Sequence, residues 1–183
     1  MTEGDAMNLN LPVLKTNRLL LRRLNESDAL QLFQIRGNEF LNRHIDVQIE
    51  KTVEQTVKYI EKINTGISDS KWLLWGVEEM KTHQLIGTVS LWQFEDNFTV
   101  CELGYVTHPD FQGLGYTKEA LQAVLTYGFN QMKLLQVSAY TEKGNSESNF
   151  LLLSLGFEYV KTMEEEGFYK KRTFHMNMYK KNH

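Results

Sequence analysis

The sequence predicts a single α/β (α+β) domain in which a mixed central sheet of about seven strands is flanked by about four helices. Three observations lead to this fold class. Segments with apolar residues at helical spacing alternate with short runs rich in aromatic and β-branched residues. The loops that join three consecutive runs between residues 72 and 106 have hairpin length, which makes these strands antiparallel neighbours. A strand, a helix and a second strand follow over residues 100–140, and this βαβ order makes those two strands parallel.

The start of the chain is expected to form one strand and a first helix. Residues 16–24 are mostly leucine and arginine, are bounded by polar residues and fit a strand. Asn25 can cap a helix that runs to about Arg36, with Asp28 in its first turn, where a carboxylate complements the helix dipole. Gly37 is expected to end that helix.

A loop and a second helix come next. Residues 38–51 have no clean period and are expected to be a loop between helices. Thr52-Val-Glu-Gln55 is a capping-box pattern, in which the Thr and Gln side chains satisfy backbone N–H groups at a helix start. Thr65-Gly66 is expected to close this second helix.

The remainder of the chain alternates strands and helices. Asn145 is expected to cap the last helix, and Gly156 stands where the glycine that follows a helix belongs. The acidic run Glu164-Glu-Glu-Gly167 is expected at the tip of the final hairpin, where it either attracts a cationic amine or is simply solvated. The expected strands span residues 72–78, 85–94, 100–106, 134–140, 157–161 and 173–179, and the third helix spans about 116–131.

Length and composition limit the possible classes of protein. A chain of 183 residues suits one core, expected over residues 10–183, with residues 1–9 as a flexible segment. A net charge of −3 with scattered Lys and Arg argues against nucleic-acid binding. The apolar runs are too short to span a bilayer and the first residues do not resemble a secretory signal, so a cytoplasmic monomer or homodimer is expected. The single cysteine, Cys101, excludes an internal disulfide and argues against a cysteine-based zinc site.

A glycine-bearing turn joins the strand at residues 100–106 to the third helix. Pro109 cannot donate to a sheet ladder, so the strand stops near it and the turn runs through Gln112-Gly-Leu-Gly115. The first backbone N–H groups of the following helix lack partners within that helix, and two glycines let an anion approach them. On these residues alone, the turn is either a phosphate cradle or a tight connection. Its spacing follows Q/R-x-x-G-x-G/A, with Thr117 in the last position.

Together with a second motif, this turn resembles the GNAT acyltransferase superfamily across the whole chain. The second motif is Asn145-x-x-Ser148-x-x-Leu151-Leu152, followed by Gly156-Phe157. Thr16-Asn-Arg-Leu and Glu102-Leu-Gly-Tyr are similar to the ribosomal-protein N-acetyltransferase (RimJ/RimL-like) branch. The resemblance implies the GNAT fold with a sheet splayed between its fourth and fifth strands. It also implies acetyl-CoA as co-substrate, with no metal, and transfer of the acetyl group to a primary amine.

The resemblance also implies where the cofactor lies. The pantetheine would bond backbone groups left unpaired by the splay, and the pyrophosphate would lie on the turn. Asn145 and Ser148 would contact the cofactor, although both can also serve as helix caps. The hydroxyl of Thr117 would either add a donor to the pyrophosphate or crowd it. The expected cofactor-binding residues are Val106, Thr107, His108, Gln112, Gly113, Leu114, Gly115, Tyr116, Thr117, Asn145 and Ser148.

Acetyl transfer to an amine needs a base for the ammonium proton and a proton donor for the departing thiolate. Glu102 shares a face with Gly104 and is the candidate base, unless it pairs with an arginine or only binds the substrate cation. Ser148 is the candidate proton donor. Cys101 should face the opposite side of the sheet, so direct transfer in a ternary complex is favoured over an acyl-cysteine. The alternative proton donors are Tyr140, Tyr159 and Tyr169.

The acceptor is the least constrained part of the prediction. An α-amine, with a pKa near 7.7–8.0 against about 10.4 for lysine, demands less of a carboxylate base, which favours the N-terminus of a protein such as a ribosomal protein. The alternatives are a small-molecule amine, such as an amino acid, polyamine or drug, and a CoA-binding sensor without turnover. His44 and Trp92 are expected to line the acceptor pocket, although a lone loop histidine is usually just solvated. That pocket is expected between residues 38–51 and the hairpin around 162–170.

Overall fold

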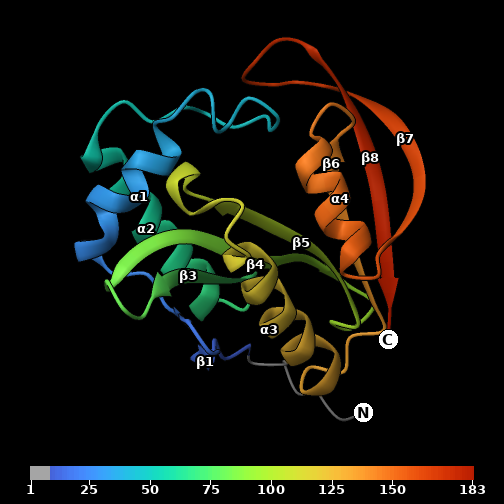
Figure 1. Cartoon of the computed structure of the whole chain (residues 1–183), viewed down its shortest axis with the longest axis horizontal. Helices are drawn as coiled ribbons and strands as arrows, with labels where there is room; N and C mark the ends of the chain where they lie inside the picture. The colour runs from blue at the N-terminus through green and yellow to red at the C-terminus, as the bar shows by residue number, and fades with distance from the viewer. Residues whose placement is uncertain (1–8) are drawn as a thin grey trace, which may run out of the picture.

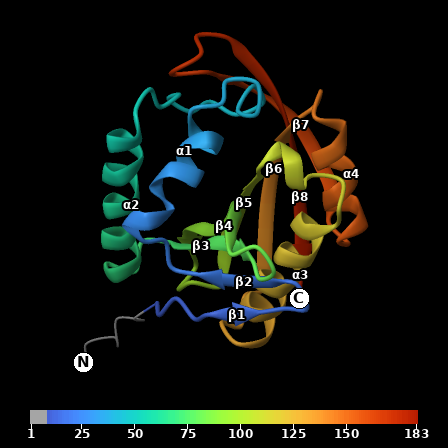
Figure 2. The same ribbon diagram turned by 60° about the vertical axis from the view of Figure 1, so that its left-hand side comes forward.

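The computed structural model describes residues 9–183, which form one mixed sheet with helices on both faces (Figures 1 and 2). The strand order is β1-β2-β3-β4-β5-β6-β8-β7. The strands are β1 (Leu14–Lys15), β2 (Leu19–Arg22), β3 (Leu73–Glu79), β4 (Gln84–Glu95), β5 (Val100–Thr107), β6 (Gln136–Glu142), β7 (Glu158–Glu166) and β8 (Thr173–Asn182). The helices are α1 (Ala29–Arg36), α2 (Val53–Ser68), α3 (Tyr116–Asn130) and α4 (Ser146–Ser154), with short 3-10 turns η1 (Glu26–Asp28) and η2 (Pro109–Phe111).

The predicted fold class is confirmed, with one more strand over the described residues than the sequence suggested. The strand expected over residues 16–24 is β2, which is shorter than predicted, and the preceding residues Leu14–Lys15 form β1, which pairs with β2 in a small hairpin. Its turn is closed by Thr16, whose N–H donates to Leu19 O at 2.9 Å and whose hydroxyl oxygen accepts from Leu19 N–H at 3.0 Å. The extra strand shifts the numbering, so the predicted fourth and fifth strands are β5 and β6.

The parallel strands β5 and β6 are paired over only part of their length. Their register runs from Val100↔Gln136 to Leu103↔Ala139. Beyond this point β5 stays paired with β4 as far as Thr107, and β6 stays paired with β8 as far as Glu142. The two strands therefore separate at one end while each keeps its outer neighbour, which is the predicted splay.

Each face of the sheet carries its own helices, as Figure 2 shows. Helices α3 and α4 pack on the face that presents Cys101 and Leu103, within the larger apolar core. Helices α1 and α2 pack on the other face with Leu74 and Leu85, in a second and smaller core. Because side chains alternate along a strand, Glu102 lies on the α1 and α2 side.

Several local predictions are confirmed. Asn25 and Thr52 each form a capping box at the start of a helical segment, and Gly156 has φ +80° just after α4. The helix expected to close at Gly66 instead continues to Ser68. Gly66 serves close packing, because a Cβ there would lie 2.0 Å from Cζ2 of Trp72.

Two further boundaries differ from the prediction. The acidic run Glu164 to Glu166 is not a hairpin tip, because it pairs with β8 inside β7 and the turn lies beyond it. Leu9, expected in the N-terminal segment, is buried, and its N–H donates to Ser70 Oγ at 2.9 Å. The rest of the segment predicted as flexible, residues 1–8, lies outside the described residues. No helix between residues 9 and 183 is both long and apolar enough to cross a membrane.

Candidate active site

The predicted strand–turn–helix unit is present after β5. His108 begins the turn, and its Nδ1 accepts the Asp110 N–H at 3.3 Å, which caps η2. Gly113 and Gly115 have φ of +72° and +81°, left-handed values that are strained for other residues, and α3 starts directly afterwards. The glycines are therefore required by the backbone path of the turn itself.

The N-terminus of α3 is open to an anion. Gly115 occupies the N-cap position and provides no side-chain hydrogen bond, whereas α2 and α4 are capped by Thr52 and Asn145. A Cβ placed on Gly113 would meet no described atom within 4 Å. The first N–H groups of this helix therefore receive no hydrogen bond from the N-cap side chain, an arrangement that fits a pyrophosphate group.

Side chains of the turn tie it back to β5. Gln112 Nε2 donates to Thr107 O at 2.9 Å. The hydroxyls of Thr117 and Thr107 are hydrogen-bonded at 2.8 Å, so Thr117 links the start of α3 to the end of β5. Two of the expected cofactor-binding residues, Gln112 and Thr117, thus already have a hydrogen-bond partner in Thr107.

The backbone groups that face the gap between β5 and β6 follow from the strand pairing. His108 N–H donates to Ile86 O at 2.7 Å, so His108 is directed toward β4 rather than the gap. By the alternation of an antiparallel ladder, Val106 also faces β4, whereas Tyr105 and Thr107 face away from it. The backbone groups of Thr107 therefore face the gap, as do those of Tyr105, whereas those of Val106 and His108 face β4.

A side-chain cluster from the N-terminal hairpin holds the first turn of α3. Glu119 accepts from Thr16 Oγ1 at 2.6 Å and from Arg18 Nε at 2.7 Å, and Arg18 Nη1 donates to Leu114 O at 3.0 Å. Burial acts to raise the pKa of Glu119, but the hydrogen bonds from Thr16 and Arg18 outweigh it and lower that pKa. Sequence reasoning identified Thr16-Asn-Arg-Leu as a motif but assigned no role to Arg18.

Glu102 stands at the edge of the splay. It is paired with Trp92 on β4 and Ser138 on β6, one residue before the pairing of β5 and β6 ends. Burial raises the pKa of Glu102 to about 7, and the negative charge of Glu165 on β7 adds to the shift. Among residues 9–183 no arginine counters this shift, so Glu102 is a carboxyl group that titrates near neutral pH and can accept a proton there.

Ser148 on α4 is hydrogen-bonded to Tyr105. The two hydroxyl oxygens are 2.5 Å apart, and burial raises the pKa of Tyr105 to about 12. Asn145 caps α4 by accepting the Ser148 N–H at 3.2 Å, so the capping prediction holds for Asn145 while the Ser148 hydroxyl points elsewhere. Sequence reasoning missed Tyr105, although strand alternation puts it on the face opposite Glu102, where α4 packs.

The other candidate nucleophile and proton donors lie less favourably. Cys101 is 1% exposed, and burial raises its pKa to about 12, which opposes formation of a thiolate. Tyr159 and Tyr169 are both exposed, and Tyr159 is hydrogen-bonded to Thr162 on its own strand. Tyr140 lies on the Glu102 side of the sheet.

The two segments expected to form the acceptor pocket meet each other. Asp46, in the loop between α1 and α2, accepts backbone N–H groups from the hairpin between β7 and β8, and both views show these segments side by side (Figures 1 and 2). His44 Nδ1 lies 2.6 Å from Glu142 Oε2, and Arg172 Nη1 donates to Glu142 Oε1 at 2.6 Å. The N–H donors to Asp46 belong to Phe168, Tyr169 and Lys170.

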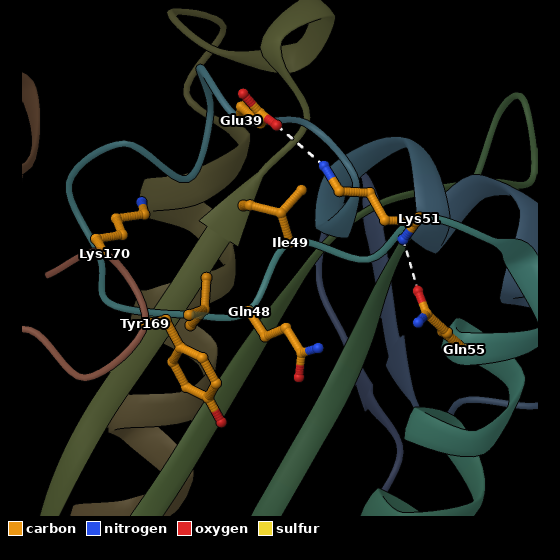
Figure 3. A pocket seen from close by; sticks show the side chains of 8 residues that line it. Glu39, Gln48, Ile49, Lys51, Gln55, Tyr169 and Lys170 are labelled. Carbon is orange, nitrogen blue, oxygen red and sulfur yellow. Dashed lines mark hydrogen bonds and ion pairs between the residues drawn. The ribbon is translucent and has the colours of Figure 1, made fainter.

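A hollow of about 370 Å³ lies where the loop and the hairpin meet (Figure 3). Lys51 crosses its rim, with an ion pair to Glu39 at 3.0 Å and its backbone N–H donating to Gln55. Trp92, the other expected acceptor residue, is 38% exposed beside Glu102, whereas His44 is engaged with Glu142. In the part of the chain that the structure describes, no group of three His, Cys, Asp or Glu residues could hold a metal ion.

A splayed sheet with an uncapped helix beside the gap and a titratable carboxyl group at its edge is an arrangement that suits an acyltransferase. The model of the acetyltransferase (GNAT) domain matches residues 18–158, so the chain belongs to the GNAT acetyltransferase family and is an enzyme of that class. The predicted superfamily is confirmed.

Relatives agree with this assignment. The chain is 27% identical over 168 residues to the uncharacterized N-acetyltransferase YoaA of Bacillus subtilis (strain 168), covering 92% of this chain and 95% of that protein. It shares the fold of an acetyltransferase from Salmonella typhimurium that modifies the N-terminal serine of ribosomal protein L7/L12, with TM-score 0.82, 18% identity and coverage of 94% and 99%. It also shares the fold of spermidine N-acetyltransferase from Vibrio cholerae in complex with CoA and spermine, with TM-score 0.79, 20% identity and coverage of 91% and 96%.

Proposed function

We propose that this enzyme transfers the acetyl group of acetyl-CoA directly to the N-terminal α-amine of a protein, in a ternary complex. The observation that carries the proposal is the half-buried Glu102, whose pKa of about 7 lies just below the 7.7–8.0 of a peptide α-amine. A base of this strength can take a proton from an α-ammonium group near neutral pH. A lysine or polyamine ammonium group, with a pKa near 10.4, would be deprotonated much less readily.

The chain's own residues suit the cofactor. Acetyl-CoA supplies an acetyl group already activated as a thioester. The N–H groups of Tyr116 and Thr117 at the start of α3 would hold the pyrophosphate, and the backbone groups of Tyr105 and Thr107 would bond the pantetheine at the splay. Bound in this way, the cofactor would direct its thioester end toward Glu102.

Ser148 donates the proton to the departing thiolate. A serine hydroxyl has one proton. It can donate that proton to the thiolate only if its hydrogen bond to a second group is one in which the serine oxygen accepts. Tyr105 can be that second group, because its raised pKa keeps the phenol protonated across the neutral range. With Tyr105 as the donor in the 2.5 Å contact, the Ser148 proton is available to the thiolate.

A small polyamine is the second candidate acceptor. The negative charge of Glu165 acts on both Glu102 and Tyr140, which shows that acidic groups converge on this side of the sheet. Such a field attracts a substrate with several ammonium groups. One structure with the same fold is a spermidine N-acetyltransferase, which agrees with this alternative.

An acceptor panel tests the proposal. Purified protein is incubated with acetyl-CoA and N-terminal peptides, free amino acids, or spermidine and spermine, and the release of free thiol is measured. The largest kcat/KM is expected with an N-terminal peptide. A larger kcat/KM with a polyamine would replace the first acceptor with the second, and tight CoA binding without release of thiol would show a sensor rather than an enzyme.

A further inference from the structure

Arg18 is fixed against the turn that precedes α3, although it comes from the hairpin of β1 and β2. Its Nε donates to Glu119 Oε2 at 2.7 Å, and its Nη1 donates to Leu114 O at 3.0 Å. Its guanidinium carbon lies 4.2 Å from the centre of the Tyr116 ring. Three contacts on different sides leave the plane of the guanidinium group little freedom to turn.

The remaining nitrogen of Arg18 faces the N-cap of α3. Nη2 lies 3.4 Å from the position that a Cβ on Gly115 would take. Among the described residues Nη2 has no hydrogen-bond partner, while the Arg18 side chain is 37% exposed and open to a ligand from solution. Two N–H donors and a permanent charge are thus available beside Gly115.

We propose that Arg18 is a cofactor-binding residue, whose Nη2 donates to the pyrophosphate of CoA when that group lies on the N-terminus of α3. This inference rests on the proposed cofactor site. A guanidinium group bonds phosphate through charge-assisted hydrogen bonds, and one that is already held in place loses little side-chain entropy when the ligand arrives.

Arg18 also has a possible indirect effect that must be separated from direct contact. Glu119 lies in the first turn of α3, where its negative charge would repel a phosphate group if Arg18 did not neutralise it. Removing Arg18 alone would therefore weaken CoA binding in either case. Removing both charges distinguishes the two, because Arg18→Gln with Glu119→Gln restores affinity only if neutralisation is the whole effect.

The experiment is calorimetric titration of the full chain with CoA, with dephospho-CoA, which lacks the 3′-phosphate, and with pantetheine, which lacks every phosphate. Arg18→Gln is expected to weaken CoA and dephospho-CoA alike, by about 10- to 100-fold, and to leave pantetheine unchanged. The double variant with Glu119→Gln is expected to stay at least about 10-fold weaker than the wild type. Arg23→Gln is the matched control, because among residues 9–183 Arg23 donates only to Asn64 O on α2, and the variant should match the wild type.

Provided that the wild type binds CoA, four outcomes would overturn the inference. Arg18→Gln could bind CoA as tightly as the wild type, or could lose as much affinity for pantetheine as for CoA. The double variant could recover the full wild-type affinity, or Arg18→Gln could lose affinity only for CoA, which carries the 3′-phosphate, and not for dephospho-CoA. Arg18→Lys, which keeps the charge but cannot bridge three partners, covers the case in which Arg18→Gln does not fold, and should show an intermediate loss. A wild type that does not bind CoA removes both this inference and the proposed function. A wild type that binds CoA through Arg18 but acetylates no amine removes the proposed function alone.

Discussion

At the scale of single residues, the environment of Glu102 sets the pH range in which this proposed base can accept a proton. Its pKa is raised to about 7, first by burial and then by the charge of Glu165. Glu102 therefore holds its proton below about pH 7 and is a carboxylate above it. Since only the carboxylate accepts a proton, turnover should rise as pH passes through about 7.

Glu102→Gln is expected to lower kcat by about 10²- to 10⁴-fold, which is the usual contribution of a general base. The rising limb of the pH profile should move up toward the pKa of the acceptor amine, because that amine must then lose its proton to water. Affinity for CoA should stay near the wild-type value. The measurement is kcat/KM between pH 5.5 and 9, with the exposed Glu95→Gln as control. An unaltered pH profile would remove Glu102 as the base.

Tyr105 offers a second test at this scale. Tyr105→Phe keeps the ring in the core and removes only the hydroxyl that contacts Ser148 at 2.5 Å. We expect kcat to fall by about tenfold, since Ser148 loses a neutral hydrogen bond of about 1 kcal/mol and with it the orientation of its proton. The KM for acetyl-CoA should not change. Tyr159→Phe, an exposed position on β7, is the control, and equal kcat in both variants would show that Tyr105 does not position Ser148.

At the scale of elements, local chemistry explains what could be predicted. The capping boxes at Asn25 and Thr52 and the glycine after α4 depend on residues within a few positions of one another, so the sequence shows them directly. The contact between Arg18 and Glu119 joins residues 101 positions apart, and that between Tyr105 and Ser148 joins residues 43 apart. Such pairs depend on how elements pack, and no local pattern reveals them.

The loop between α1 and α2 is held in place by one carboxylate. Asp46 accepts three backbone N–H groups of the hairpin, and although burial opposes the shift, these bonds lower the pKa of Asp46. Asp46→Ala leaves those N–H groups without an acceptor and should loosen the wall of the acceptor pocket. We expect the KM for the acceptor to rise by about 5- to 20-fold while the KM for acetyl-CoA stays constant.

Steady-state kinetics in which the concentrations of acetyl-CoA and acceptor are both varied would give the two KM values separately. Asp69→Ala, at the end of α2 and away from the hairpin, is the matched control. If Asp46→Ala changed both KM values equally, the loop would act on the fold as a whole rather than on the acceptor pocket.

At the scale of the whole molecule, each face of the sheet has its own apolar core. The larger core under α3 and α4 packs against Phe111 and Tyr116, which flank the glycine-bearing turn, and the smaller core under α1 and α2 holds the two helices that the 38–51 loop joins. Periodicity and hairpin spacing predicted the mixed sheet and its helices, but not which helices cover which face. They did not predict the acceptor, because the loop and hairpin proposed to bind it carry no periodic pattern.

CoA binding should therefore stabilise the entire domain through one turn. At a CoA concentration 100 times its Kd, binding adds about 2.7 kcal/mol to the free energy of unfolding, which corresponds to a rise in Tm of about 5–10 °C for a chain of this size. Gly115→Val should lose this rise, because φ is +81° at this position and a β-branched side chain is strained there and would lie beside Arg18 Nη2. The variant itself should be less stable by about 1–3 kcal/mol.

Thermal melts with and without CoA measure both effects, with Gln122→Val on the exposed face of the same helix as control. A full CoA-induced rise in Gly115→Val would show that the cofactor does not lie on this turn.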